Sequence, residues 1–244
     1  DFFFPGKVSD QLIWSGCYWF GLSFYLCLLW LLYDLLIFVI RFLGYLPDMG
    51  TSYPVSAGVS ITFAAIGLVV YGAWNASNPV LRHYDITIHK KASTCKQLHI
   101  IMISELHLGL LVRKKRLMKA VEMINELKPD LVLMPGDIID ENIGAFVENQ
   151  MPNILRNIQS RLGVFGILGS HEYIYGHSEK SLLYLKQSGI TILRDSCITI
   201  ANEICLAGRD DLLKKQLVGT SRLELSSILQ ECNRENAIIL MDHQ

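Results

Sequence analysis

Two long apolar segments stand near the start of the chain, and short apolar runs alternating with helical patterns follow them. Residues 18–40 contain Asp34 as their single charged residue, and residues 55–74 contain none. A helix needs about 20 apolar residues, at a rise of about 1.5 Å each, to cross the hydrocarbon core of a bilayer. The intervening residues 44–54 include Gly, Pro, Asp and Ser, as in a short exposed turn. The pattern predicts a helical membrane hairpin within a membrane region at residues 1–78.

Charged residues near these segments indicate how they lie in a bilayer. Asp34 is within two helical turns of Arg41, which favours pairing or snorkelling near the interface over a role in the apolar core. Basic residues are more frequent after the second segment than in the turn, where Arg41 stands at the edge. They are Arg82, Lys90, Lys91 and Lys96. The positive-inside tendency therefore predicts a multi-pass protein of the cell membrane whose following domain lies in the cytoplasm.

Residues 98–244, after a linker at 79–97, show the pattern of an α/β domain. Short apolar runs predict strands at 98–103, 131–134, 164–168, 190–193, 198–200, 204–207 and 237–241. Helical spacing of apolar residues predicts helices at 113–127, 145–161, 178–187 and 221–230. Strands that first alternate with helices and then follow one another indicate an α/β fold with a mixed sheet.

Composition limits the classes of function and partner. Charged residues make up 18% of the 244 residues, less than the quarter or so that is usual for a soluble domain, because the apolar segments carry so few. A net charge of −1 gives no reason to expect nucleic acid as a partner. The six cysteines include no CxxC pair, which predicts free thiols rather than a disulfide framework or a zinc site. No feature of the sequence indicates an oligomeric state.

Polar side chains suited to metal binding follow four of the predicted strands. The sequences are SELHLG after Ile103, PGDIID after Met134, GSHEYIYG after Leu168 and DHQ after Met241. The carboxyl ends of neighbouring strands build the binding sites of open α/β sheets, so we expect the ligand-type residues of these motifs to gather there. These residues are Glu105, His107, Asp137, His171 and His243.

Each motif alone is more typical of a solvated loop or a helix N-cap, and Asp210 and Asp211 are predicted to be solvated or capping residues. Four such endings in order favour a metal site instead. Carboxylates together with imidazoles suit Mn, Fe or Zn better than Ca. Asp137, after a glycine turn, can bridge two metal ions about 3.5–4 Å apart. Such a pair lowers the pKa of a shared water, and a nearby histidine can protonate the leaving group.

The ordered motifs resemble those of the calcineurin-like metallophosphoesterases, which carry DxH, GDxxD, GNHE, a strand ending in His, and GHxH. ELH at 105–107, GDIID at 136–140, GSHE at 169–172 and DH at 242–243 stand in the same order. AGRDD at 207–211 and the segment at 71–86 are similar to a membrane-associated bacterial subgroup. The resemblance covers residues 71–244. It implies a metallophosphoesterase α/β sandwich of mixed sheets flanked by helices, incomplete in this chain.

The resemblance also implies two divalent metal ions, a phosphomonoester or phosphodiester substrate, and a role for each motif residue. Glu105 and His107 would hold the first metal, and Asp137 would bridge the two. Ser170 and His243 would hold the second metal. His171 would be the catalytic general acid, or the group that steadies the scissile phosphate.

The chain departs from the family pattern at three places. Glu105 replaces Asp, and its longer side chain can displace a metal by about an ångström, which can cost about 10²-fold in rate. Ser170 replaces Asn, and a hydroxyl is a weaker ligand than an amide carbonyl. The GHxH motif would lie after Gln244, which agrees with the expectation that a chain beginning at Asp1 is a fragment of a longer protein.

Three hypotheses for the function remain open. The leading one is a metal-dependent phosphoesterase that works at the lipid bilayer on a phosphate ester, such as a lipid-linked one. The second is a catalytically degenerate, membrane-anchored binding or scaffold domain of the same fold, which Glu105 and Ser170 motivate. The third is a transporter in which this domain is regulatory, and it would require further membrane helices upstream.

Overall fold

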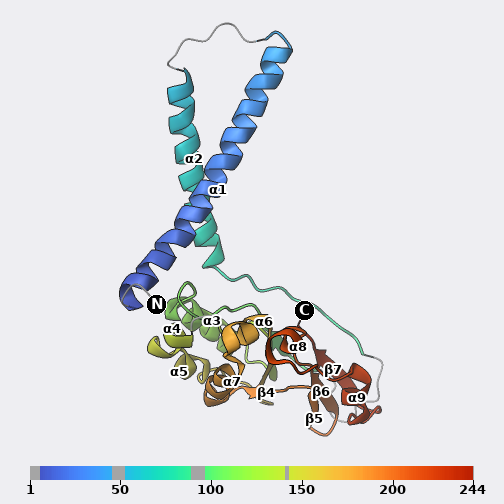
Figure 1. Cartoon of the computed structure of the whole chain (residues 1–244). Helices are drawn as coiled ribbons and strands as arrows, with labels where there is room; N and C mark the ends of the chain where they lie inside the picture. Colours follow the sequence, from blue (N-terminus) through green and yellow to red (C-terminus); the bar gives the residue numbers. More distant parts are fainter. Residues whose placement is uncertain (1–5, 46–52, 89–96, 141–142, 244) are drawn as a thin grey trace. The chain divides into compact units, whose positions relative to one another are not determined.

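The computed structural model describes residues 6–45, 53–88, 97–140 and 143–243 (Figure 1). The chain divides into two units, residues 1–82 and residues 83–244, and each is described by itself. The predictions that concern Lys90, Lys91, Cys95 and Lys96 lie outside the described residues, as does most of the predicted turn between the apolar segments.

The described part of the first unit consists of two long helices in contact, α1 (Gly6–Phe42) and α2 (Tyr53–Ala76). Most of their side chains are exposed, including the large apolar Phe20, Phe38 and Phe63. A helix that is apolar on every face suits lipid or a protein core rather than water, and these helices are not buried. Residues 8–42 and 55–76 are long and apolar enough to cross a membrane.

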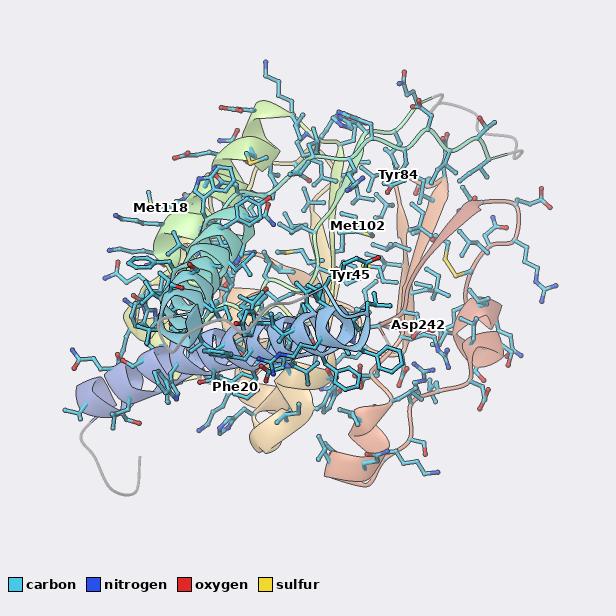
Figure 2. The ribbon with its side chains drawn as sticks, turned by 90° about the horizontal axis from the view of Figure 1, so that it is seen from above. Phe20, Tyr45, Tyr84, Met102, Met118 and Asp242 are labelled. Carbon is cyan, nitrogen blue, oxygen red and sulfur yellow. A yellow bond between two sulfur atoms is a disulfide. The ribbon has the colours of Figure 1, made fainter. Side chains whose placement is uncertain are left out.

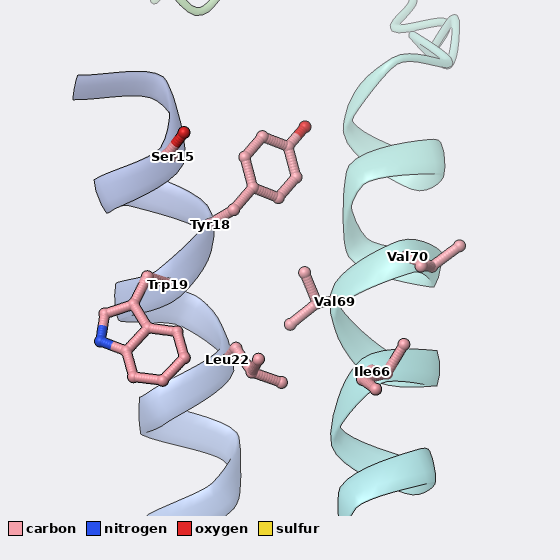
Figure 3. A pocket seen from close by; sticks show the side chains of 7 residues that line it. All are labelled: Ser15, Tyr18, Trp19, Leu22, Ile66, Val69 and Val70. Carbon is pink, nitrogen blue, oxygen red and sulfur yellow. The ribbon is translucent and has the colours of Figure 1, made fainter. Parts of the chain in front are cut away.

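An apolar groove lies between α1 and α2 (Figure 3). Leu22 of α1 and Val69 of α2 face each other across the groove. Its lining consists of Ser15, Tyr18, Trp19, Leu22, Ile66, Val69 and Val70. Hydroxyl groups are rare among these side chains and charges are absent from them, so the groove is lipophilic.

The second unit contains two sheets (Figure 1). The first is parallel, with β1 (Ile100–Met102), β2 (Leu131–Pro135), β3 (Val164–Ile167) and β4 (Thr191–Ile192) in that order. The second pairs β5 (Ser196–Ile200) antiparallel with β6 (Ile204–Gly208), and β6 parallel with β7 (Ala237–Met241). The α/β fold predicted from the sequence is confirmed, with the strands divided between two sheets.

Short helices flank these sheets. They are α3 (Lys114–Glu126), α4 (Ile143–Glu148), α5 (Met151–Leu155), α6 (Ser170–Tyr173), α7 (Ser178–Gln187), α8 (Leu213–Val218) and α9 (Leu225–Gln230), with a 3₁₀ turn η1 (Ile174–Gly176). The single helix predicted at 145–161 is wrong. The helical pattern is interrupted at Gln150, whose φ of 54° is left-handed, and α5 begins at Met151 with Pro152 in its first turn.

Alternate residues of β2 pack into two different cores. Val132 and Met134 face α3, α5 and α7, where Leu117 is among their partners. Leu131 and Leu133 face the second sheet and pack with the apolar residues of β6 and β7. Side chains of a strand point alternately to its two faces, so β2 is buried on both. The first sheet is therefore held between a helical layer and the second sheet.

A disulfide joins Cys205 of β6 to Cys232, which follows α9. The prediction of free thiols is therefore wrong for these two residues, and it holds for Cys17, Cys27 and Cys197. The sequence separation of 27 residues explains the failure, because no local spacing marks such a pair.

Candidate metal centre

The four motifs meet at the carboxyl ends of β1, β2, β3 and β7. Because β1, β2 and β3 are parallel neighbours, the loops that follow them leave the same edge of the first sheet. β7 belongs to the second sheet and brings His243 against this edge. A Cβ atom at Gly136 would lie only 2.7 Å from the His243 ring, so the approach requires glycine at that position.

Asp137 lies at the centre of the site. It is 4% exposed, and its φ of 50° is left-handed. The N–H of His171 donates to its Oδ1 at 2.9 Å. Glu105 and His107 also have left-handed φ values, of 56° and 43°. Such backbone is uncommon outside glycine and clusters at functional sites, where the surrounding structure must stabilise it.

Two groups of three potential ligands share Asp137. His107, Asp137 and His171 form one group, and Glu105, Asp137 and His243 form the other; the ligand atoms of each group lie within 4.8 Å of one another. Asp137 Oδ2 is 3.8 Å from His107 Nε2, and Asp137 Oδ1 is 3.8 Å from His243 Nε2. An ion about 2.0–2.2 Å from each donor fits between atoms at this separation. Each carboxylate oxygen thus faces a different imidazole, as in a bridging ligand.

Glu105 contacts both of these histidines, although the family resemblance pairs it with His107. Its Oε2 is 3.0 Å from His107 Nε2, and its Oε1 is 2.9 Å from His243 Nε2. Ser170 Oγ is 3.4 Å from both carboxylate oxygens of Asp137. The structure therefore brings together every residue named as a metal ligand or catalytic group from the sequence, and their individual roles stay predictions.

The electrostatics of Glu105 and His243 reflect this contact. Burial raises the pKa of Glu105, but hydrogen bonds from His243 and His107 outweigh burial and hold the pKa below its ordinary value. Burial lowers the pKa of His243, whereas Asp211 and Glu105 raise it, with a net rise. Carboxylates and imidazoles in this arrangement favour bound positive charge, which a divalent cation can supply.

Glu172, at the end of the GSHE motif, is a structural residue that the sequence reasoning missed. Its side chain is buried, and its carboxylate accepts hydrogen bonds from four backbone N–H groups at 2.7–3.1 Å. The donors are Asp137, Ile138, Ile139 and Gly169. Burial raises the pKa of Glu172, while the amide hydrogen bonds lower it, with a net rise. One carboxylate therefore fastens the loop after β2 to the loop after β3.

Asp140 and Asp211 orient two of the histidines. Asp140 Oδ1 is 3.2 Å from His171 Nδ1, and Asp211 Oδ2 is 3.1 Å from His243 Nδ1. A carboxylate on one ring nitrogen fixes the tautomer and leaves the other nitrogen for a metal or a substrate. Asp211 also accepts the N–H of Leu213, the first residue of α8, at 2.8 Å, although the N-cap residue of α8 is Leu212. The prediction that Asp211 is solvated is wrong, because it is buried.

Asp210 is also buried, so the expectation of a solvated side chain is wrong for it too. It accepts hydrogen bonds from Tyr173 and Arg194, and it forms an ion pair with Lys214 at 2.9 Å. Burial raises the pKa of Asp210, but Tyr173 and the two cations outweigh burial and lower it. AGRDD is the sequence signal for these two aspartates, because it begins within the buried strand β6 and the aspartates follow the end of that strand.

Comparison with known proteins places this site in a family. Residues 98–244 match the family model described as calcineurin-like phosphoesterase. The chain belongs to the calcineurin-like phosphoesterases.

Relatives of the chain include proteins that are named as transmembrane and a protein that is named as a pyrophosphatase. The chain is 31% identical over 185 residues to a transmembrane protein with metallophosphoesterase domain of Danio rerio, covering 72% of this chain and 42% of the relative. A protein of the same description from Bos taurus is 28% identical over 188 residues, with the same coverage. A UDP-2,3-diacylglucosamine pyrophosphatase of Chlamydia muridarum is 32% identical over 125 residues, 49% of this chain and 37% of the relative. The chain spans less than half of the length of these relatives.

Proposed function

We propose that this chain belongs to a membrane-anchored, metal-dependent hydrolase that cleaves a phosphomonoester or phosphodiester. The observation that carries the proposal is the position of Asp137, whose two oxygens each face a different histidine at 3.8 Å. Two divalent ions, Mn, Fe or Zn, would neutralise phosphoryl oxygens there and activate a water for attack on phosphorus.

Each residue of the site has a proposed role in binding the metal ions or in transferring a proton. His107, Asp137 and His243 hold positive charge at the centre of the site, with Glu105 beside both histidines. Ser170 supplies a hydroxyl within reach of Asp137 and is the weakest of the proposed ligands. Asp140 holds His171 by Nδ1, so its Nε2 is left to donate a proton to the leaving oxygen or to bind a phosphate oxygen.

The membrane is the proposed setting of this reaction, and α1 and α2 would span it. The Danio rerio and Bos taurus relatives carry the word transmembrane in their names, which supports a multi-pass protein of the cell membrane. The Chlamydia muridarum relative is named for an acylated nucleotide sugar, which supports a lipid-linked phosphate ester as substrate. The similarity to a membrane-associated bacterial subgroup stays a prediction.

Two observations give opposite indications of the side of the membrane on which the α/β domain lies. The basic residues after α2 favour the cytoplasm, whereas a disulfide such as Cys205–Cys232 is typical of an oxidising compartment. A cysteine introduced at the exposed Ser221, in a variant whose free cysteines are replaced by serine, can be labelled with an impermeant maleimide. Labelling only after lysis supports the cytoplasmic side that we predict, and labelling of intact cells contradicts it.

The direct test is an activity assay on protein expressed from the complete reading frame, purified in detergent and supplied with Mn²⁺. We expect turnover of a generic aryl phosphodiester, and a loss of at least about 10²-fold in His107→Ala and Asp137→Ala. Wild-type turnover equal to that of the two variants would contradict the proposal.

The same assay tests the alternative of a degenerate binding or scaffold domain. Glu105 and Ser170 motivate this alternative, since both depart from the family pattern. The double variant Glu105→Asp with Ser170→Asn restores that pattern. A large gain from near-zero activity would favour the degenerate domain, whereas a small change favours a working site.

A further inference from the structure

A basic surface at the beginning of α3 has no role in the metal centre or in the core. It consists of four consecutive cations and two apolar residues: Arg113, Lys114, Lys115, Arg116, Leu111 and Met118. All six are exposed, and Met118 lies on the outer side of α3 (Figure 2). The buried face of α3 is formed by other residues, including Leu117 and Val121, so packing does not explain the basic surface.

The position of these cations is electrostatically unfavourable for the helix. The N-terminus of a helix carries partial positive charge, and acidic residues are preferred there. The first turn of α3 has no acidic residue, and Arg113 at the N-cap provides no side-chain cap. Within the described part of the chain, Lys114, Lys115 and Arg116 form no salt bridge. Their charge is therefore available to an anionic partner, and such a partner would relieve the repulsion.

The loop before α3 presents the apolar part of the surface. The N–H of Gly109 donates to the carbonyl of Val112 at 3.2 Å, and Leu108 is buried and bridged to Ile139. This turn leaves Leu111 45% exposed next to the cations. Basic side chains flanked by exposed Leu and Met match an anionic lipid interface, into which the apolar groups can insert below the headgroups.

We infer that this basic surface docks on the anionic headgroups of the membrane in which α1 and α2 are anchored. The inference rests on the membrane attachment proposed above. Between Ala76 and Ile100 the chain can reach at most about 80 Å, which keeps the domain close to the bilayer and raises its effective concentration there. Each cation near an anionic leaflet strengthens the association about fivefold.

Docking has a consequence for the metal centre. Leu111 follows His107 by four residues, a span of at most about 14 Å. A membrane contact at Leu111 therefore holds the loop of the metal centre at the level of the headgroups, where the phosphate of a lipid-linked substrate lies. The surface would thus present the site to a substrate that stays in the bilayer.

Amide hydrogen exchange tests this inference on the full chain in lipid nanodiscs. The amides of Lys114 and Lys115 begin a helix and lack intrahelical partners, so they exchange quickly unless they are covered. We expect exchange over residues 110–118 to be at least about tenfold slower in discs containing one third anionic phosphatidylglycerol than in phosphatidylcholine discs. High salt should remove most of this protection.

The variant that removes three of the four charges combines Lys114→Gln, Lys115→Gln and Arg116→Gln, and it should lose most of the protection. Equal exchange in the two kinds of disc would overturn the inference, as would protection that persists in this variant. The same exchange as wild type elsewhere in the domain shows that the variant is folded.

A matched control combines Lys180→Gln, Lys186→Gln and Lys215→Gln, three exposed lysines outside the basic surface, and it should keep the protection. Loss of protection in this control would show a general charge effect and overturn the inference.

Protection by soluble polyglutamate in neutral discs, without protection in anionic discs, would overturn the inference in favour of an acidic protein partner. Asp137→Ala should abolish turnover and leave the protection intact, which separates failure of this inference from failure of the proposed function.

Discussion

At the scale of single residues, Glu172 shows how one buried carboxylate can hold together the loops of the candidate metal centre. Its oxygens accept hydrogen bonds from N–H groups of the loop after β2, which precede it by 33–35 residues, and from the N–H of Gly169 after β3. Backbone donors leave no mark on the sequence, so the partners of Glu172 could not be predicted. The residues that gather around Asp137 could be predicted, because each directly follows an apolar strand.

Glu172→Gln should destabilise the domain, because the amide NH₂ group would face backbone N–H groups that lose their acceptor. We expect a loss of about 1–3 kcal/mol in the free energy of unfolding, measured by urea denaturation. The exposed Glu122→Gln is the control and should change stability by less than about 0.5 kcal/mol. Equal stability of the two variants would show that the four hydrogen bonds contribute little.

Asp211→Ala should weaken metal binding, because His243 would lose the carboxylate that fixes its ring. The affinity for Mn²⁺, measured by titration calorimetry, is expected to fall about 10- to 100-fold. Asp85→Asn, at an exposed position outside the site, should leave the affinity unchanged. An unchanged affinity in Asp211→Ala would contradict the orienting role that its 3.1 Å contact with His243 suggests.

At the scale of elements, hydrophobic spacing predicted the helices and strands that bury apolar residues and missed a helix that buries none. The strands and α3 carry strong apolar patterns, and they form close to the predicted positions. α8 has no buried residue, so no periodicity marks it. The apolar spacing at 145–161 continues across the break at Gln150, and Pro152 was the one local signal that the helix ends.

The disulfide is an element-scale constraint, because it ties β6 to the end of α9. Cys232→Ser should lower the free energy of unfolding by about 3–4 kcal/mol, the value expected for a loop of this length. Thermal unfolding in detergent without reductant measures the loss, and Cys197→Ser is the control with a free thiol. Equal melting temperatures for wild type and Cys232→Ser would show that the bond does not form in solution.

At the scale of the whole molecule, amino-acid composition alone separates the two units. The near absence of charge in residues 18–40 and 55–74 predicts the long helices, and α1 extends further than predicted, to Gly6. Its 37 residues span about 55 Å, more than the roughly 30 Å core of a bilayer. Part of α1 therefore lies beyond the hydrocarbon core if its apolar centre crosses the membrane. The division of the strands into two sheets could not be predicted, because pairing between distant strands has no local signal.

The central claim is that Asp137 joins two metal positions in one site. Electron paramagnetic resonance of the purified protein, titrated with Mn²⁺, tests it most directly. Two bound ions per chain with an exchange-coupled spectrum are expected, and the coupling should disappear in Asp137→Ala. A spectrum of isolated, uncoupled Mn²⁺ at full occupancy, or no uptake of Mn²⁺ at all, would contradict the account.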